Sequence, residues 1–145
     1  MKKHVSLLLV LCMVAAIAGG CATNKANKGK AADVDLTVLS STMVYAEVFN
    51  IMNKPDEYIG KTIRMRGPYT TSYYDDTKQY YHFVIIKDAA ACCQQGLEFI
   101  WNGDHEYPAD YPKEQTEIEV IGVFGRYVEQ GASYFYLAVD DLVVI

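Results

Sequence analysis

The stretch EIEVIGVFGRY, Glu117–Tyr127, carries the clearest signal for the fold. Its β-branched and aromatic residues favour a strand, and glycines stand within it at Gly122 and Gly125. A glycine inside a strand often marks a bulge or a tight bend. We therefore expect a strongly bent strand, of the kind that a small closed sheet needs.

Alternating or β-rich runs predict four more strands. Ile63 and Met65 lie on one face of the first run, and Leu97, Phe99 and Trp101 share a face of a later one. The five predicted strands cover residues 62–67, 80–86, 97–101, 117–127 and 133–139. Residues 142–145 either continue the last strand or form a short sixth one. Polar connections follow the first, third and fourth strands at residues 75–78, 102–113 and 129–132.

A short helix precedes these strands. Val44, Val48 and Ile51 repeat at helical spacing, and a hydroxyl of Ser41 or Thr42 is suited to cap the helix start. The sequence Asn53-Lys54-Pro55 ends the pattern, because the residue before a proline avoids the helical region. The spacing predicts a helix over about residues 43–53.

These elements predict an all-β domain with one N-terminal helix. Five strands with bent, glycine-bearing members early and late suit a five-stranded OB-like Greek-key barrel. The proline-containing loop at residues 102–113 occupies the place where many OB folds carry a helix. An SH3-like barrel is the alternative architecture.

The first twenty residues are typical of an export signal. Lys2 and Lys3 precede an apolar run, Val5–Ile17, which suits a secretory signal better than a full membrane span. The order Ala18-Gly19-Gly20-Cys21 resembles a bacterial lipobox, in which the cysteine thiol receives diacylglycerol. The alternatives are a signal peptide cut elsewhere and a retained transmembrane anchor.

The predicted organisation is a lipoprotein signal peptide at residues 1–20, a lipid-anchored flexible tether at 21–40 and the barrel domain at 41–145. The tether prediction rests on the small, polar and basic residues 22–32. We expect the domain to face the extracytoplasmic side of the cell membrane or the outer membrane.

The charge of the domain disfavours nucleic acid as a partner. Five of the thirteen Lys and Arg residues and two of the eighteen Asp and Glu residues precede residue 36. Residues 36–145 therefore carry a net charge of −8, which repels phosphate backbones.

Four stretches, NKPDEYIGKTIRMRGPY, ACCQQGLEF, YPKEQTEIEVIGVFGRY and YLAV, are similar to a group of uncharacterised bacterial OB-fold proteins. The most specific pieces are the paired cysteines and a lead-in formed by Pro55, Tyr58, Gly60 and Lys61. Some members of that group are lipoproteins, and others are the soluble part of a predicted two-component permease. The resemblance covers roughly residues 43–144 and implies the OB fold and a separate membrane-protein partner, but no established activity.

Cys92 and Cys93 are adjacent in the sequence. Neighbouring Cα atoms lie about 3.8 Å apart, closer than the roughly 4.4–6.8 Å of ordinary disulfides, so a bond between them would be strained. The pair could instead bind zinc or copper with His82, and Asp88, Glu98 and His105 are further potential ligands. A thiol redox pair and two partly buried small residues in a strand connection are the other interpretations.

Aromatic residues form the second distinctive feature, since the chain has twelve tyrosines. They either fill the half-wet surface of a small barrel or form a stacking platform on it. The candidate binding surface comprises Arg64, Arg66, Tyr81 and Trp101. A saccharide, peptide or protein fits it better than nucleic acid, and exposed salt links are the simpler role for the arginines.

No catalytic motif stands out in the sequence, and no catalytic residue is predicted. The sequence therefore predicts a non-enzymatic, lipid-anchored binding or accessory module of the cell envelope, with a membrane complex as its candidate partner. The alternatives are a metal-binding lipoprotein and an extracytoplasmic thiol redox protein.

Overall fold

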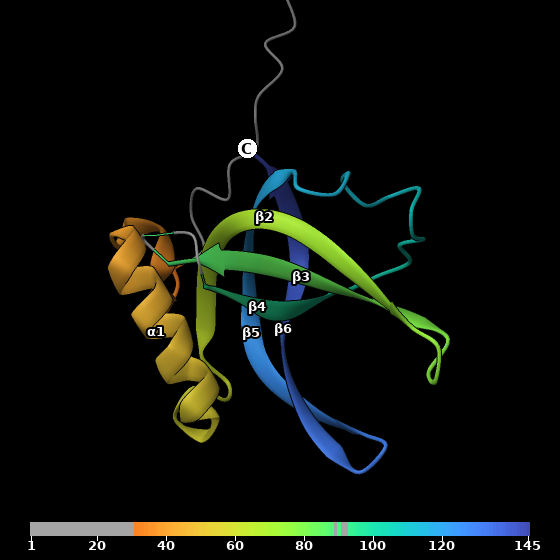
Figure 1. Ribbon diagram of the computed structural model, residues 1–145, viewed down its shortest axis with the longest axis horizontal. Coiled ribbons are helices and arrows are strands. Elements are labelled where there is room, and N and C mark those ends of the chain that lie inside the picture. Colours follow the sequence, from red (N-terminus) through yellow and green to blue (C-terminus); the bar gives the residue numbers. More distant parts are fainter. Residues whose placement is uncertain (1–30, 89, 91–92) are drawn as a thin grey trace, which may run out of the picture.

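The computed structural model describes residues 31–88, 90 and 93–145; the predicted signal peptide, Cys21 and Cys92 lie outside them. The described residues form a six-stranded mixed sheet and one α-helix (Figure 1). The strands are β1 (Val34–Asp35), β2 (Thr62–Tyr74), β3 (Gln79–Lys87), β4 (Gln94–Trp101), β5 (Glu117–Glu129) and β6 (Ala132–Val144). The helix is α1 (Ser41–Asn53), and two 3-10 turns cover Leu36–Val38 and Pro55–Glu57.

The strand order is β1-β2-β3-β4-β6-β5, with an additional pairing between β2 and β5. The long strand β2 makes this pairing possible, because residues 62–68 pair with β5 and residues 69–74 pair with β3. Strands β4 and β6 run parallel, whereas the β2–β3, β3–β4 and β5–β6 pairs are antiparallel. Each of the strands β2 to β6 is therefore paired on both sides.

Glycines permit the sharpest bends of the sheet. The register of β5 against β6 shifts between Val120 and Gly122, and a Cβ atom on Gly122 would lie 2.6 Å from the carbonyl oxygen of Ala138. On β2, a Cβ atom on Gly67 would collide with the carbonyl oxygen of Ile85. The bulge expected from the glycines of β5 is thus confirmed at Gly122.

The helix packs its apolar face against the sheet and closes one side of the core (Figure 1). Val48 and Ile51 of α1 are fully buried, together with Ile63 of β2 and Phe124 of β5. Burial of such side chains is the main stabilising contribution in a domain of this size. The predicted helix is confirmed, and it begins two residues earlier than expected, at Ser41.

The segment before the helix is folded, which corrects the predicted end of the tether at residue 40. Strand β1 pairs in parallel with β2, and Leu36 is only 2% exposed within the core. The backbone N–H of Thr37 donates to Asp35 Oδ1 at 3.0 Å, which caps the first 3-10 turn. Sequence patterns missed this segment because a two-residue strand is too short to show any periodicity. Residues 142–144 continue β6 and do not form a strand of their own.

Candidate functional site

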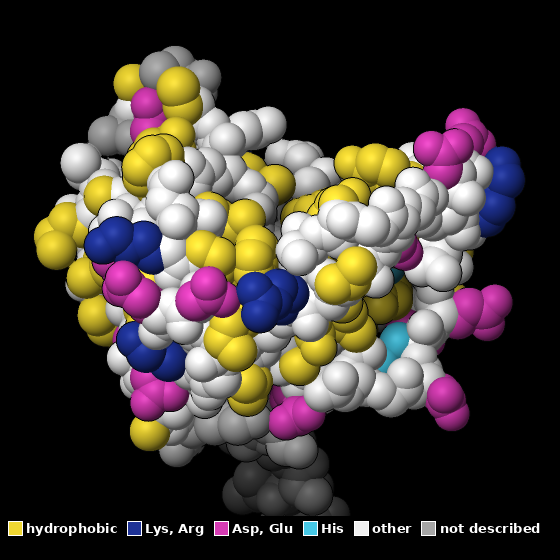
Figure 2. All heavy atoms as spheres, turned by 90° about the horizontal axis from the view of Figure 1, so that it is seen from below, with side chains coloured by type: hydrophobic (Ala, Val, Ile, Leu, Met, Phe, Trp, Pro, Cys, Tyr) yellow, Lys and Arg dark blue, Asp and Glu magenta, His cyan; other side chains and the backbone are white. Residues whose placement is uncertain are grey.

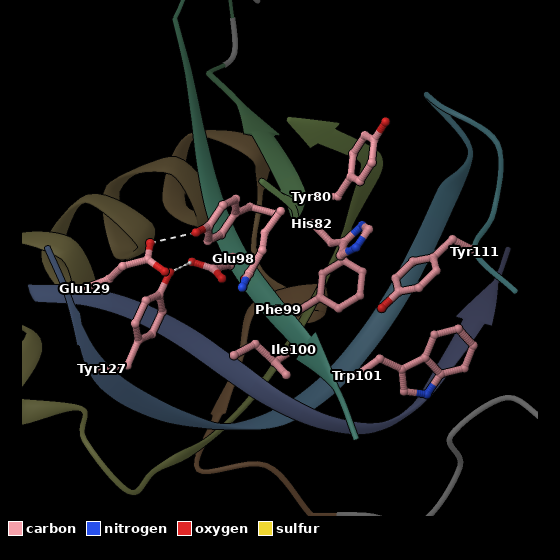
Figure 3. Close-up of a pocket in the computed structure, with 11 residues that line it drawn as sticks. Tyr80, His82, Glu98, Phe99, Ile100, Trp101, Tyr111, Tyr127 and Glu129 are labelled. Carbon is pink, nitrogen blue, oxygen red and sulfur yellow. Dashed lines mark hydrogen bonds between the residues drawn. The ribbon is translucent and has the colours of Figure 1, made fainter. Parts of the chain in front are cut away.

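An aromatic hollow of about 370 Å³ lies on β3 and β4, between the end of β5 and the loop of residues 102–116. Figure 3 shows its labelled side chains, and Figure 2 shows a histidine in a recess among hydrophobic side chains. The residues that line the aromatic hollow are Gln79, Tyr80, Tyr81, His82, Glu98, Phe99, Ile100, Trp101, Tyr111, Tyr127 and Glu129.

Strand alternation explains why aromatic side chains line this hollow. On β3, the row that contributes Val84 and Ile86 to the core continues outward with His82 and Tyr80. On β4, the buried row of Leu97 and Phe99 continues with Trp101. Each strand therefore extends its core-facing row past the edge of the core into one wall of the hollow, and the opposite rows contribute Gln79, Tyr81, Glu98 and Ile100.

His82 is held between two tyrosines. The Tyr69 hydroxyl lies 2.8 Å from His82 Nδ1, and the ring of Tyr111 stacks on the imidazole at a centroid distance of 4.0 Å. Desolvation by burial lowers the pKa of His82 to about 4. His82 is therefore a neutral, positioned ring near neutral pH, and not a source of positive charge.

The loop of residues 102–116 contributes rings to the site, although the sequence predicts only a surface loop there. Tyr111 packs on His82, and Tyr107 contacts Tyr80 at 4.5 Å between ring centroids. His105 stacks on Trp101 at 3.8 Å with an angle of 16° between the rings. The loop thus covers one end of the hollow with a layer of aromatic side chains.

Two carboxylates lie at the opposite end of the hollow, each bound by a tyrosine (Figure 3). The Tyr127 hydroxyl donates to Glu98 Oε2 at 2.9 Å, and the Tyr81 hydroxyl donates to Glu129 Oε2 at 2.6 Å. These four residues also line an adjoining hollow of about 240 Å³. The remaining residues of the adjoining hollow are Tyr74, Asp76, Thr77, Phe83, Gln130 and Tyr134.

Glu98 differs from Glu119, the other buried acid among the described residues. Both are 8% exposed, but Glu119 forms ion pairs with Arg64 and Arg66 at 3.9 and 2.7 Å. Among the described residues, Glu98 has no basic partner, and the Tyr127 hydroxyl is its hydrogen-bond donor. Desolvation raises the pKa of Glu98 to about 7, and the charge of Glu129 adds to the effect.

The structure divides the binding surface that the sequence predicts. Tyr81 and Trp101 both line the aromatic hollow. Arg64 and Arg66 do not, because their partners are Asp35 and Glu119 at the β1 and β5 side of β2. Both arginines therefore form ion pairs, which is the simpler role expected for them.

The structure does not bring His82 and Cys93 together. His82 pairs with Phe99 on β4, whereas Cys93 directly precedes the Lys87–Gln94 pair at the other end of the two strands. Five residue steps at about 3.3 Å each separate the His82–Phe99 pair from the Lys87–Gln94 pair by roughly 17 Å, and Cys93 lies one residue beyond the latter pair. A metal site that joins both residues is therefore wrong for this fold, and Cys92 lies outside the described residues.

Cys93 lies in the connection between β3 and β4, as one interpretation of the cysteine pair expects. Its backbone N–H donates to Asp88 Oδ1 at 3.3 Å, and its carbonyl accepts from the Asp88 N–H at 3.0 Å. It is exposed, so the partial burial expected for it is wrong.

Seven residues of the site were not among the binding or ligating candidates expected from the sequence: Gln79, Tyr80, Phe99, Ile100, Tyr111, Tyr127 and Glu129. Glu98 was expected only as a potential metal ligand. The alternation Leu97-Glu98-Phe99 does place Glu98 opposite the core-facing row. Its burial, however, depends on contact with Tyr127 of β5, 29 residues away, which no local pattern reveals.

Comparison of the sequence with models of known families and with curated proteins finds no match. The resemblance to bacterial OB-fold lipoproteins thus stays a prediction from the quoted motifs.

Over residues 31–88, 90 and 93–145, no helix is long and apolar enough to cross a bilayer. Within the same residues, no group of three or more metal-ligating side chains occurs.

Proposed function

We propose that this chain is a lipid-anchored binding or accessory module of the bacterial cell envelope, without catalytic activity, whose ligand site is the aromatic hollow. The observation that carries the proposal is the position of that hollow. It lies on the neighbouring strands β3 and β4, between the end of β5 and the loop of residues 102–116, and is lined by seven aromatic or histidine rings. Aromatic walls with a few placed polar groups are typical of small-ligand sites.

We further infer that the domain is an OB-like Greek-key barrel. Counted from β2, the five long strands pair in the order 1-2-3-5-4, and the fourth pairs again with the first. The parallel contact between the third and fifth of them, β4 and β6, supports the same topology over an SH3-like barrel.

The position of the hollow matches the part of OB folds that recognises ligands. In such folds the second and third strands and the hairpins after strands one and four bind oligonucleotides and oligosaccharides. Here those elements are β3, β4, the β2–β3 hairpin and the β5–β6 hairpin, and all four contribute residues to the two hollows.

The polar groups of the hollow favour ligands other than nucleic acid. Glu98 and Glu129 are its ionisable acids, and neither Lys nor Arg lines it. Carboxylates repel phosphates, whereas they accept hydrogen bonds from hydroxyl and amine groups. Saccharides and peptides have such donors next to flat or apolar faces that stack on Tyr and Trp rings.

Site-specific photocrosslinking in the native bacterial envelope tests the binding function. A photoreactive phenylalanine analogue replaces Ile100, which is 42% exposed and lines the hollow. The matched control replaces Val123, which is 43% exposed on β5 and lines neither hollow. Adducts at position 100 and none at position 123 support the proposal, and equal yields at both positions contradict it.

The lipid anchor has its own test. The intact chain should fractionate with membranes and carry a diacylglycerol-modified N-terminal Cys21 by mass spectrometry. A Cys21→Ser variant and globomycin treatment should both block this processing. An unmodified Cys21 in the mature protein would refute the anchor, while leaving the binding site untouched.

A further inference from the structure

The two carboxylates of the aromatic hollow lack a compensating positive charge. Glu98 is nine-tenths buried, and its Oε1 atom accepts no hydrogen bond from any described residue. Neither hollow is lined by Lys or Arg. Two basic residues next to residues of the hollow have other partners: Lys78, beside Gln79, pairs with Asp75, and Arg126, beside Tyr127, pairs with Asp56.

This arrangement has a free-energy cost that folding alone does not offset. A buried carboxylate is destabilising unless a charge or several hydrogen bonds replace the water that it loses. Glu119 meets that requirement through Arg64 and Arg66, whereas Glu98 receives one neutral hydrogen bond from Tyr127. Among the described residues, Glu98 Oε1 accepts no hydrogen bond and is not among the fully buried atoms that lack a partner, so it is open to the hollow and available to a donor group of a ligand.

The aromatic rings around the two carboxylates also favour a positively charged partner. Tyr81 and Tyr127 line both hollows, and their hydroxyl groups point to the carboxylates, which leaves the ring faces to form the walls. Tyr74 contacts Tyr81 edge to face, and Tyr134 stacks on Tyr127. Rings with a negative face beside a carboxylate attract organic cations through cation–π and ionic contacts.

We propose that the aromatic hollow binds an organic ammonium group, which enters between Tyr81 and Tyr127 and contacts the carboxylates of Glu98 and Glu129. This inference rests on the proposed binding function and specifies the chemistry of its ligand. The body attached to the ammonium group then lies toward His82, Tyr111 and Trp101 at the other end of the hollow (Figure 3). A volume of about 370 Å³ accommodates an amino-sugar ring or a basic side chain.

An organic cation fits the site better than a metal ion does. Calcium and magnesium take six or more oxygen ligands, and their sites use several carboxylates or carbonyl groups. No set of three or more metal-ligating side chains is present among the described residues. The wall beside the two carboxylates consists of rings, which coordinate metals poorly and stabilise alkylammonium groups well.

The chain has an internal reporter for the test. Trp101 is its only tryptophan and lines the hollow, so its fluorescence responds to occupancy. The full chain, purified from membranes in detergent, is titrated with n-butylammonium and with n-butanol as the uncharged counterpart. We expect n-butylammonium to change Trp101 emission and raise the melting temperature, and n-butanol to do neither at equal concentration.

Two conservative variants and one control assign the site. Glu98→Gln and Glu129→Gln should each weaken n-butylammonium binding about tenfold, since each removes a charge-assisted contact. Glu47→Gln is the matched control, because Glu47 also accepts a hydrogen bond from a tyrosine, Tyr58, but lines neither hollow. Its affinity for n-butylammonium should equal that of the unaltered chain. Melting curves identify any variant that does not fold, and Glu129→Gln then decides, since Glu129 is less buried than Glu98.

Further probes distinguish the two sources of an ammonium group, an amino sugar and a basic side chain. Glucosamine is compared with N-acetylglucosamine, and Nα-acetyl-lysinamide with Nα-acetyl-norleucinamide. Tighter binding by either charged member than by its neutral partner supports the inference and identifies the source. Equal binding of charged and neutral members would overturn it, as would n-butylammonium binding that neither Gln variant weakens, or tighter binding of calcium chloride. If adducts form at position 100 while no ammonium probe binds, the ammonium inference alone fails; if neither occurs, the binding function fails too.

Discussion

The hydroxyl of Tyr127 lies 2.9 Å from Oε2 of Glu98 and supplies the hydrogen bond that this buried carboxylate receives from the described chain. The same contact affects both partners, because the neighbouring carboxylate and burial raise the pKa of Tyr127. Above about pH 7, where Glu98 is ionised, the tyrosine hydroxyl is the proton donor of the pair. Predictions for Glu98 and His82 concern groups in the hollow, and predictions for Gly67 and Glu119 concern the sheet that supports it.

The first prediction concerns Glu98→Gln and pH. Tyr127 and Glu129 of β5 and Tyr81 of β3 face this part of the hollow, and the pKa of Glu98 is raised to about 7. The folded state thus binds more protons than the unfolded state between about pH 4.5 and pH 7, so the contribution of Glu98 to stability falls as pH rises through this range. Glu98→Gln should be more stable than the unaltered chain by about 2 kcal/mol above this range.

Urea denaturation of both proteins above and below this range measures the effect. The comparison uses the difference between the two proteins at each pH, which removes contributions from other titrating groups. Glu47→Gln again serves as the control and should show no such pH-dependent gain. A constant difference between Glu98→Gln and the unaltered chain would show that Glu98 titrates like an ordinary carboxyl.

The second prediction concerns His82, whose pKa is lowered to about 4. The unfolded state binds a proton at this residue near pH 6.5, whereas the folded state resists it. The contribution of His82 is therefore fully present above about pH 6.5 and is lost as pH falls toward 4. The imidazole resonances of His82 should titrate near pH 4 by NMR, and His82→Phe should reduce the loss of stability in acid. A midpoint near 6.5 would contradict the burial of this ring.

The third prediction concerns Gly67, where β2 passes close to β3. A methyl group there would collide with the Ile85 carbonyl oxygen, so we expect Gly67→Ala to destabilise the domain by about 3 kcal/mol or more. Gly96→Ala is the matched control, because the closest atom to its new Cβ would be the flexible end of the Ile85 side chain, at 3.1 Å, and Phe83 would lie at an ordinary contact distance of 3.6 Å. Thermal denaturation by circular dichroism compares the two variants. Similar melting temperatures would show that the backbone at Gly67 relaxes freely.

The fourth prediction concerns Glu119 as the shared partner of two arginines. Glu119→Gln leaves Arg64 and Arg66 without their common acid, and we expect a loss of about 2 kcal/mol. Lys78→Ala, which removes an exposed pair with Asp75 in the β2–β3 turn, should change stability by less than about 0.5 kcal/mol. Chemical denaturation measures both. If both substitutions changed the free energy of unfolding equally, the burial of Glu119 would make no additional contribution to stability.

Local sequence patterns predicted most of the elements of the fold. Helix α1 and all five long strands follow from the spacing of apolar residues, and Gly122 from its place within a strand. The short β1 strand was missed, because its position depends on pairing with residues 63 and 64 of β2. Pairing across long separations is a property of the whole chain, which no window of a few residues contains.

The candidate site was predicted only in part, for a related reason. Tyr81 and Trp101 could be named from their strands, but the carboxylates acquire their character from neighbours on β5. The pairing of His82 with Cys93 was wrong because strand register places these two residues at opposite ends of β3 and β4. Residue types indicate which chemistry is available, while register decides which groups meet.

The division of β2 between two partners has a consequence for how the domain is completed. Residues 62–68 pair with residues of β5 that lie about fifty to sixty positions further along the chain. A nascent or proteolysed chain that ends before Glu117 would leave this segment as an open edge, ready to add a strand from another molecule. Correct assembly must therefore wait for the C-terminal hairpin of β5 and β6, and until that hairpin pairs, residues 62–68 are the segment that needs protection from aggregation.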